Sequence, residues 1–594
     1  MKIFRVVVKL QILALILVVA SCGRHENVET KEEEEYTGPA KVATSVEMTP
    51  ISQLNAGASE LDSHAGRTGR SALMKDFRRS VNVPKSVFGE IDPEYLRMLR
   101  CADGSYLMIY TSSGGNVYTS LSQDLKNWEK GRSVLQKFYF TNFLGDNDAR
   151  YYMNGDAALL SDGTILLSAS FRAFHAYAYE EGQEVGGIVI IRSTDNGRTW
   201  SEPQEIYHGT NWEPMIIQIP SGQIQCYFSE SRPWISGNNS GSGMVWSDDG
   251  GVTWQPDRLG NPRTVVRQKY VHHDSGLTLY TDQMPAVLQL NNGSYAGIFE
   301  SSFTETTAYH KISMAWSPEL WPELVGDEVG PADRVNCLYR GSAPSLIQFP
   351  SGETAFSYGS TYLYGRMGDE TAHNWTEPSK LLPGKGSMGA IELIGSHEMT
   401  AIMHDSDKTA TAPVGIAVYV LNHDVTPSSH AVTVDGRNAD WSNEDEALFV
   451  GAKSAKQATL RFSVADDCLC VLAEVSNDEI SSQDNVSITF ASSEDGADGL
   501  RIASDCRGSY VTERMNGGWE EVVLPSLSGK GFAIRGAYNG TIDDESDLDE
   551  GWLLEFRIPL SELPSSGNPL LVDFTLGTAG GTESTGWKGV ILDL

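Results

Sequence analysis

The chain repeats one pattern of hydrophobic and polar positions along roughly its first two thirds. An apolar segment is followed by a tight turn that contains glycine, and then by a second apolar segment, as in a β-hairpin. Clear copies read ALLSDGTILLSA, IQIPSGQIQCYF and IQFPSGETAFSY. The turn glycines are Gly104, Gly163, Gly222, Gly293, Gly352 and, in a weaker copy, Gly395. The pattern therefore predicts six hairpins of one kind.

The spacing of these glycines predicts the size of the repeated unit. Three of the five intervals are 59 residues long, which leaves room for a second hairpin in each unit. Four-stranded units arranged around an axis are the blades of a β-propeller, and ring closure removes exposed sheet edges. We therefore expect an all-β protein, with a six-bladed β-propeller over residues 86–424 followed by a β-sandwich domain over residues 430–594.

A second repeat lies in the other half of several units. Residues 193–200 (STDNGRTW) and 247–254 (SDDGGVTW) share the pattern Ser-x-Asp-x-Gly-x-Thr-Trp, with degenerate copies near Asp124 and Asp369. Short Ser and Asp side chains bind the backbone donors of a turn, while Gly adopts positive φ. Turn chemistry explains every position, so we expect a structural role. The pattern resembles the Asp-box, or BNR repeat, of the sialidase superfamily.

The parity of strands in a blade predicts where chemistry can occur. If the glycine turn lies at the bottom, then the start of the first strand and the end of the second strand both lie at the top. Polar residues seven to nine positions from each glycine should therefore converge on that face. They are Arg97, Asn154, Asp156, Arg172, Glu213, Glu230, Glu300 and His404. Any one of them could simply face water, but together they supply the paired carboxylates that glycoside cleavage needs.

Three of these blades resemble those of the exo-acting α-1,5-L-arabinanases of the sialidase superfamily over residues 90–420. The similar segments are WEP followed by YFSE, MP followed by NG and FE, and the stretch 154–172. The resemblance implies that Glu213 is the general acid/base and Glu300 the nucleophile. It also implies that Asn154 and Arg172 face the substrate. Asp156, Glu230, Arg97 and His404 are further candidate substrate-binding residues.

Two departures from that family keep alternatives open. The stretch between Glu213 and Glu300 is about fifteen residues longer than in the family, mostly around residues 233–242. The family's Tyr-Tyr-Ser-Asp strand end reads Tyr-Phe-Ser-Glu here, so that Glu230 competes with Glu213 for the acid role. True sialidases carry a Phe/Tyr-Arg-Ile-Pro motif in the first blade. Here the segment reads YLRM, which displaces Arg97 in register, and an odd shift turns a side chain to the other face.

The two ends of the chain predict an export signal and an accessory domain. Residues 1–22 have basic residues, an apolar run and VASC at the end, which resembles the lipobox of bacterial lipoproteins with Cys22 as the lipidated residue. Residues 23–85 read as a polar tether and lead-in. Residues 430–594 resemble a family-nine-like carbohydrate-binding sandwich. Trp519 and Trp587 of this domain are candidates for stacking on sugar rings. The alternative, which we weigh more heavily, is that each packs in the core.

Composition limits the partners of the protein. A formal net charge of −33 repels phosphate backbones, so we expect no nucleic acid partner. The spacing of cysteines and histidines suggests no zinc site, and nothing indicates a metal or an organic cofactor. We expect an exported lipoprotein of the outer membrane, displayed on the cell surface and acting on an oligo- or polysaccharide.

The sequence thus predicts an exo-acting glycoside hydrolase, of retaining mechanism, with arabinan as the best single substrate. An exo-α-sialidase or ulosonic-acid hydrolase is the enzymatic alternative. A surface glycan-binding lipoprotein without catalysis is the non-enzymatic alternative.

Overall fold

The computed structural model describes residues 47–50, 53–54, 68–178, 185–231, 241–271, 278–301, 310–319, 321, 333–386, 388–526, 531–546, 548–564 and 569–592. The predicted signal peptide, Cys22 and most of the predicted tether lie outside these residues. Within them, no helix is both long enough and apolar enough to cross a membrane.

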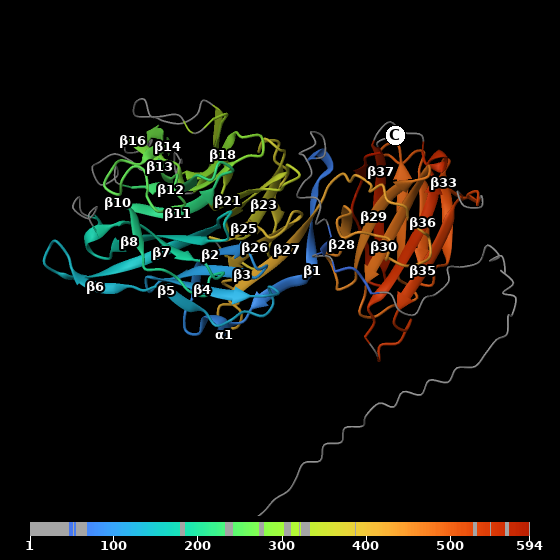
Figure 1. Cartoon of the computed structure of the whole chain (residues 1–594), viewed down its shortest axis with the longest axis horizontal. Helices are drawn as coiled ribbons and strands as arrows, with labels where there is room; N and C mark the ends of the chain where they lie inside the picture. The colour runs from blue at the N-terminus through green and yellow to red at the C-terminus, as the bar shows by residue number, and fades with distance from the viewer. Residues whose placement is uncertain are drawn as a thin grey trace, which may run out of the picture. The chain divides into compact units, whose positions relative to one another are not determined.

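The described residues from 72 to 422 form six antiparallel sheets of four or five strands, which are the blades of the predicted propeller (Figure 1). Their innermost strands contact one another in cyclic order, so the ring is closed. The first three blades are β2 (Pro93–Arg100), β3 (Tyr106–Ser112), β4 (Asn116–Ser122), β5 (Arg132–Leu135); β6 (Phe138–Thr141), β7 (Asn147–Leu159), β8 (Ile165–Ala173), β9 (Gly187–Ser193), β10 (Gln204–His208); and β11 (Asn211–Gln218), β12 (Ile224–Glu230), β13 (Gly241–Ser247), β14 (Arg263–Val266).

The remaining blades follow the same order along the chain. They are β17 (Gln283–Gln289), β18 (Tyr295–Ser301), β19 (Lys311–Ser317), β20 (Asp333–Arg340); β21 (Ser342–Gln348), β22 (Thr354–Gly359), β23 (Leu363–Gly368), β24 (Ser379–Lys380); and β25 (Ala390–Leu393), β26 (Glu398–His404), β27 (Val414–Asn422) with β1 (Ala72–Val83). A separate pair consists of β15 (Gln268–Val271) and β16 (Thr278–Thr281), and the short helices are η3 (Thr68–Arg70), α1 (Lys85–Phe88), η4 (Ala176–Ala178) and η6 (Leu560–Glu562).

The position of β1 corrects one predicted boundary. The sequence analysis assigned residues 23–85 to a tether and lead-in, but β1 is the outer strand of the sixth blade and pairs with β27 from Ala72 opposite Asn422 to Val83 opposite Val414. The alternation of charged and apolar residues in β1 was weak, which hid the strand. The ring is therefore closed by a strand from the N-terminal side of the propeller.

The blades are held together by apolar side chains that alternate along each strand. Between the first two blades, for example, Leu107 and Ile109 of β3 pack in one cluster with Ile165 and Leu167 of β8. All four side chains are inaccessible to solvent. Since successive residues of a strand point to opposite faces, each strand contributes to the contacts with both neighbouring blades.

The repeated Ser-x-Asp-x-Gly-x-Thr-Trp segments form turns, as expected. Asp195 Oδ1 accepts hydrogen bonds from Ser193 Oγ and from the backbone N–H of Thr199, each at 2.8 Å. Trp200 Nε1 donates to the carbonyl of Gly197 at 3.1 Å. Hydrogen bonds from Thr199 are the main reason why the pKa of Asp195 is lowered to about 2. The aspartate is therefore fully used by the turn.

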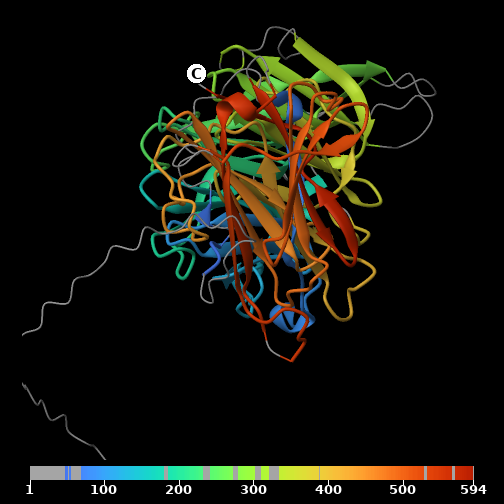
Figure 2. The same cartoon turned by 90° about the vertical axis from the view of Figure 1, so that its right-hand side faces the viewer.

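The C-terminal part of the chain folds into two antiparallel sheets, coloured orange to red in Figure 2, which share one apolar core. The first sheet contains β28 (Ala447–Val450), β29 (Gln457–Ala465), β30 (Cys468–Ser476), β36 (Gly551–Pro559) and β35 (Ala533–Asn539). The second contains β34 (Trp519–Glu521), β33 (Tyr510–Met515), β32 (Leu500–Asp505), β31 (Asn485–Ala491), β37 (Leu570–Thr578), β38 (Gly581–Ser584) and β39 (Lys588–Val590). This is the predicted β-sandwich.

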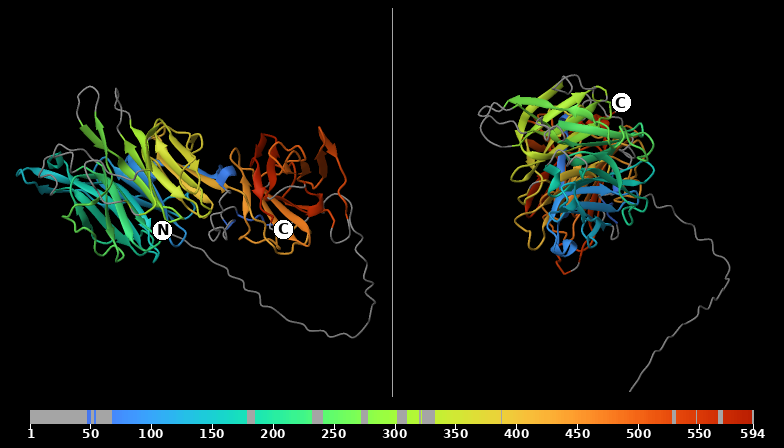
Figure 3. Two further views of the ribbon diagram at one scale, coloured as in Figure 1. Left: turned by 90° about the horizontal axis from the view of Figure 1, so that it is seen from above. Right: turned by 90° about the vertical axis from the view of Figure 1, so that its left-hand side faces the viewer.

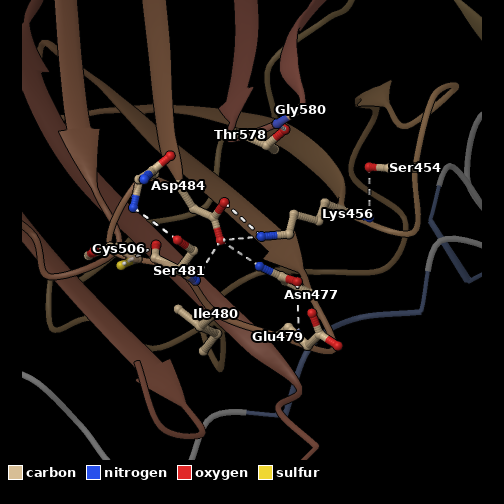
Figure 4. A network of polar contacts seen from close by, with 12 residues as sticks. Ser454, Lys456, Asn477, Glu479, Ile480, Ser481, Asp484, Cys506, Thr578 and Gly580 are labelled. Carbon is tan, nitrogen blue, oxygen red and sulfur yellow. Dashed lines mark hydrogen bonds and ion pairs between the residues drawn. The ribbon is translucent and has the colours of Figure 1, made fainter. Parts of the chain in front are cut away.

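Buried polar groups fix the connections of the sandwich. Asp484 is fully buried and accepts hydrogen bonds from Lys456 Nζ, Asn477 Nδ2 and the backbone N–H of Ser481 (Figure 4). These contacts hold the turn between β30 and β31 against β29. All three donors meet the carboxylate of Asp484, so we assign these residues a structural role.

Candidate active site

A strained residue recurs at one end of the innermost strand in five of the six blades. Five non-glycine residues, each nine positions before the turn glycine of its blade, have positive φ angles. They are Tyr95 (51°), Asn154 (55°), Glu213 (48°), Met284 (46°) and Ala343 (49°). Next to each of them the pairing of the first and second strands shifts, as in a β-bulge. The bulges re-aim the following side chains at equivalent places around the ring.

Glu213 occupies the bulge of the third blade. Its Oε2 accepts a hydrogen bond of 2.8 Å from Ser229 Oγ on β12, and that hydroxyl accepts a 2.8 Å bond from the backbone N–H of Met284. Loss of hydration and then the charge of Glu300 raise the pKa of Glu213 to about 7, whereas the Ser229 hydrogen bond opposes this rise. The carboxyl is therefore suited to hold a proton near neutral pH.

Glu300 lies on β18 of the next blade and is only 8% exposed. The backbone N–H of Ala343 donates to its Oε2 at 3.0 Å, and His310 Nδ1 lies 2.7 Å from its Oε1. The hydrogen bond to Glu300 raises the pKa of His310. Both carboxylate oxygens of Glu300 thus meet donors, which stabilise negative charge. The two predicted catalytic carboxyls face a common site, since the charge of Glu300 acts on Glu213 and both act on His310.

Arg172 and Asn154 present polar atoms beside these carboxyls. The guanidinium carbon of Arg172 lies 3.2 Å from the ring centre of Trp212, and desolvation lowers the pKa of Arg172 to about 10. Among the described residues, Arg172 Nε and Asn154 Oδ1 are buried without a hydrogen-bond partner. Buried polar atoms are rarely left in this state. That the two residues face a substrate, as the sequence implies, stays a prediction.

Arg97 and Asp156 line a central cavity of about 430 Å³ together with other residues of the innermost strands. The Arg97 guanidinium lies 3.9 Å from the ring centre of Tyr95, and its Nε lies 3.9 Å from Asp156 Oδ1. Asp156 Oδ2 accepts a 2.9 Å bond from the backbone N–H of Ile216, and burial raises the pKa of Asp156 to about 6. Glu392, which the sequence analysis missed, lines the same cavity, and burial raises its pKa to about 8.

The structure corrects the prediction for Glu230. Its neighbour Ser229 points to Glu213, and successive residues of a strand point to opposite faces. Glu230 therefore lies on the other face of β12, where the hydroxyl of Tyr207 is 3.5 Å from its Oε1. Strand parity removes Glu230 from competition for the acid role.

His404 lies at the end of β26, where its Nε2 is 3.2 Å from Asp92 Oδ1 and 3.5 Å from Thr409 Oγ1. These contacts place it on the rim formed by the sixth and first blades. Its predicted role in substrate binding stays a prediction.

A positional signal in the sequence could have sharpened the choice of Glu300. Seven residues after the turn glycine, the first four blades carry Thr111, Ser170, Ser229 and Glu300. Thr111 Oγ1 accepts the backbone N–H of Asn154 at 3.1 Å, as Ser229 and Glu300 accept the equivalent N–H of the following blade. Glu300 is thus a carboxylate in a position where its neighbours have hydroxyls.

No protein-family model matches the chain. A curated protein of Sitophilus oryzae named pectinesterase is 24% identical over 166 residues, which are 23% of this chain and 44% of that protein. The chain thus aligns with less than half the length of that relative.

The solved structures found to be similar include a protein of unknown function from Dyadobacter fermentans, with 14% identity, 60% of this chain and 100% of that chain covered, and a TM-score of 0.41. An α-L-arabinofuranosidase of Fusarium graminearum with an iminosugar inhibitor has 13% identity, 59% and 98% coverage and a TM-score of 0.40. An α-L-arabinanase of Penicillium chrysogenum with arabinobiose has 17% identity, 58% and 98% coverage and a TM-score of 0.38.

Proposed function

We propose that the protein is an exo-acting glycoside hydrolase whose acid/base is Glu213 and whose nucleophile is Glu300. The observation that carries the proposal is the contrast between two neighbouring carboxyls. Desolvation raises the pKa of Glu213 to about 7, whereas Glu300 has a donor on each oxygen. A carboxyl that holds a proton near neutral pH, beside a second carboxyl whose two oxygens both meet donors, is a pair that can serve as acid and nucleophile.

In this mechanism an oxygen of Glu300 attacks the anomeric carbon while Glu213 gives its proton to the leaving glycosidic oxygen. The glycosyl ester with Glu300 is then hydrolysed by a water molecule from which Glu213, now ionised, removes a proton. Arg172 and Asn154 orient hydroxyl groups through their unpaired Nε and Oδ1. The anomeric configuration is retained, because inversion occurs twice.

Arabinan is the substrate that we propose, because the segments around Glu213 and Glu300 resemble those of the exo-arabinanases. Incubation with arabinan oligosaccharides, a sialoside and a panel of pectic glycans tests this choice. Release of arabinobiose supports it, and free sialic acid would instead support the sialidase alternative. Binding without any product would leave only a role in adhesion to glycans.

The roles of the two glutamates are tested by Glu213→Gln and Glu300→Gln on two substrates. On an oligosaccharide, loss of the acid should reduce kcat by about 10²–10⁴-fold, and loss of the nucleophile should reduce it further. On an aryl glycoside with an acidic phenol as leaving group, Glu213→Gln should lose far less activity, since that group departs without a proton. Equal losses of both variants on both substrates would contradict the assignment.

We also propose that Cys22 anchors the protein in the outer membrane at the cell surface, which the lipobox-like VASC sequence supports. Cys22→Ser should move the protein from the membrane fraction to the soluble fraction of the producing cells, without changing kcat of the purified protein. Retention of this variant in membranes would contradict the anchor.

A further inference from the structure

The second blade has an extension that its neighbours lack among the described residues. Its sheet has five strands, and β7 is 13 residues long where the equivalent β11 has 8. The extra residues of β7 precede Asn154, so they extend beyond the end of the ring where the bulges lie. They pair with β6 and project from the rest of the blade (Figures 1 and 3). We call residues 138–153 and the adjoining Phe174 the aromatic arm.

The aromatic arm exposes large apolar side chains. It contains four of the six exposed aromatic side chains of the described residues: Phe138 (44%), Tyr139 (65%), Phe143 (39%) and Phe174 (52%). Scattered single apolar residues on a surface need no explanation, but a group of them on one projecting element marks a binding surface.

Polar contacts hold the aromatic arm in one conformation. Asn142 Oδ1 accepts the backbone N–H groups of Leu144 and Asp146 at 2.9 and 3.1 Å, and Asn142 Nδ2 donates to buried Asp148 at 3.1 Å. At its base, Arg150 donates to Glu205 at 2.6 Å. A surface that is ordered before binding loses little conformational entropy when a ligand arrives.

The aromatic arm is continuous with the candidate active site. Tyr151 stands directly opposite Arg172 in the pairing of β7 with β8, and its ring lies 5.0 Å from that of Phe174 at an interplanar angle of 31°. Arg172 in turn covers the ring of Trp212, which precedes Glu213. Ring contacts and strand pairing therefore link Phe174 to Trp212, the residue before the proposed acid.

We infer that the aromatic arm binds the leaving-group part of a glycan chain, the sugars that lie beyond the bond to be cleaved. This inference rests on the proposed function, because the acid protonates the oxygen of the leaving group and so lies on that side of the bond. The arm belongs to the second blade, whose Arg172 covers Trp212 of the third blade beside Glu213, whereas Glu300 lies on the fourth. Exposed aromatic rings match the apolar C–H faces of sugar rings.

The arm is tested with Phe174→Ala and Tyr139→Ala on substrates that differ only beyond the cleaved bond. With arabino-oligosaccharides of increasing length, each variant should raise KM for the longer chains by about three- to tenfold. With an aryl arabinobioside, which has no sugar on the leaving side, kcat and KM should stay at wild-type values. Phe77→Ala and Tyr510→Ala remove aromatic side chains of similar exposure (45% and 42%) outside the arm and serve as matched controls.

Three outcomes overturn the inference: unchanged KM for long chains, equal losses on the aryl glycoside, or equal losses in the control variants. Calorimetric titration of the longest oligosaccharide into Glu300→Gln protein, with and without Phe174→Ala, measures the contribution of Phe174 to binding affinity in the absence of turnover. If the wild-type protein cleaves none of the glycans, the proposed function fails. The same titration on wild-type protein then tests only whether the arm binds glycan: weaker binding in Phe174→Ala supports a glycan-binding arm, and equal binding overturns it.

Discussion

The hydroxyl of Ser229 connects Glu213 to the backbone of the following blade. It donates to Glu213 Oε2 and accepts from Met284 N–H, both at 2.8 Å. The hydrogen bond to Glu213 favours the ionised carboxylate and therefore lowers its pKa, against the larger effects of desolvation and Glu300. Ser229 thus adjusts the pH at which the proposed acid loses its proton.

The pH dependence follows from the sign of these effects. The pKa of Glu213 is raised to about 7, and the acid works only when protonated, so kcat/KM should fall as pH rises through about 7. Ser229→Ala removes an interaction that lowers this pKa, so the alkaline limb of the profile should move to higher pH. Ser170→Ala is the matched control, because Ser170 holds the same position in its blade but donates to Asn211.

An unchanged or lower midpoint in Ser229→Ala would contradict this reading of the site. The variant also leaves the backbone N–H of Met284 without its acceptor, which costs about 1–3 kcal/mol of stability when the group is buried. The profile is therefore measured well below the melting temperature of the variant.

At the level of single residues, the sequence predicted the two carboxyls but not their surroundings. Glu213 and Glu300 follow from strand parity and the resemblance to the arabinanases. His310 and Glu392 gave no signal, because their roles depend on which strands meet across the ring. The prediction for Glu230 failed because a window of seven to nine positions after the turn glycine includes both faces of the strand: Glu300 stands seven positions after its glycine, whereas Glu230 stands eight.

Among the elements, the turns were the most predictable part of the chain. The spacing of Ser, Asp, Gly, Thr and Trp requires no distant partner, so it predicted both complete turns. The bulges were not predicted, because a positive φ at Tyr95, Met284 or Ala343 has no signature in residue type. These strained positions are stabilised by the neighbouring blade, whose side chains accept two of the bulge N–H groups.

Substitutions at two turn glycines can separate backbone strain within a turn from contacts of that turn with a neighbouring blade. Gly222 and Gly197 have φ angles of 89° and 81°, so alanine is strained at either. A Cβ at Gly222 would meet no atom within 4 Å, whereas a Cβ at Gly197 would lie 2.9 Å from Leu107 Cδ1 in the preceding blade.

Gly222→Ala should therefore cost about 1–2 kcal/mol, the usual penalty of the left-handed conformation. Gly197→Ala should lower the melting temperature further, because the steric clash at the interface of two blades adds to the same backbone strain. Calorimetric melting of the two variants side by side measures the difference. A smaller effect at Gly197 would contradict the packing of that turn against Leu107.

On the scale of the whole molecule, the sequence predicted the number of blades and the sandwich that follows. It did not predict how the ring closes. β1 and β27 are far apart in the chain, and β1 lacks the turn glycine that identified the other hairpins. Ring closure depends on pairing between distant segments, which the periodicity of any one segment does not predict.

Removal of residues 1–83 should leave the sixth blade with three strands. The edge of β27 would then expose unpaired backbone groups, which promote association between chains. We expect aggregates in size-exclusion chromatography and a lower melting temperature, whereas removal of residues 1–67, which leaves β1 intact, should preserve a monodisperse propeller. A stable, monodisperse product of the longer truncation would contradict the role of β1.

The pairing of Ala72 with Asn422 also sets a condition on biosynthesis. A growing polypeptide cannot complete its propeller until Asn422 has left the ribosome. Until then β1 lacks its partner strand β27. Contacts between such distant segments form slowly. The outer strand of the sixth blade is therefore among the first strands of the propeller to be made and the last to be paired.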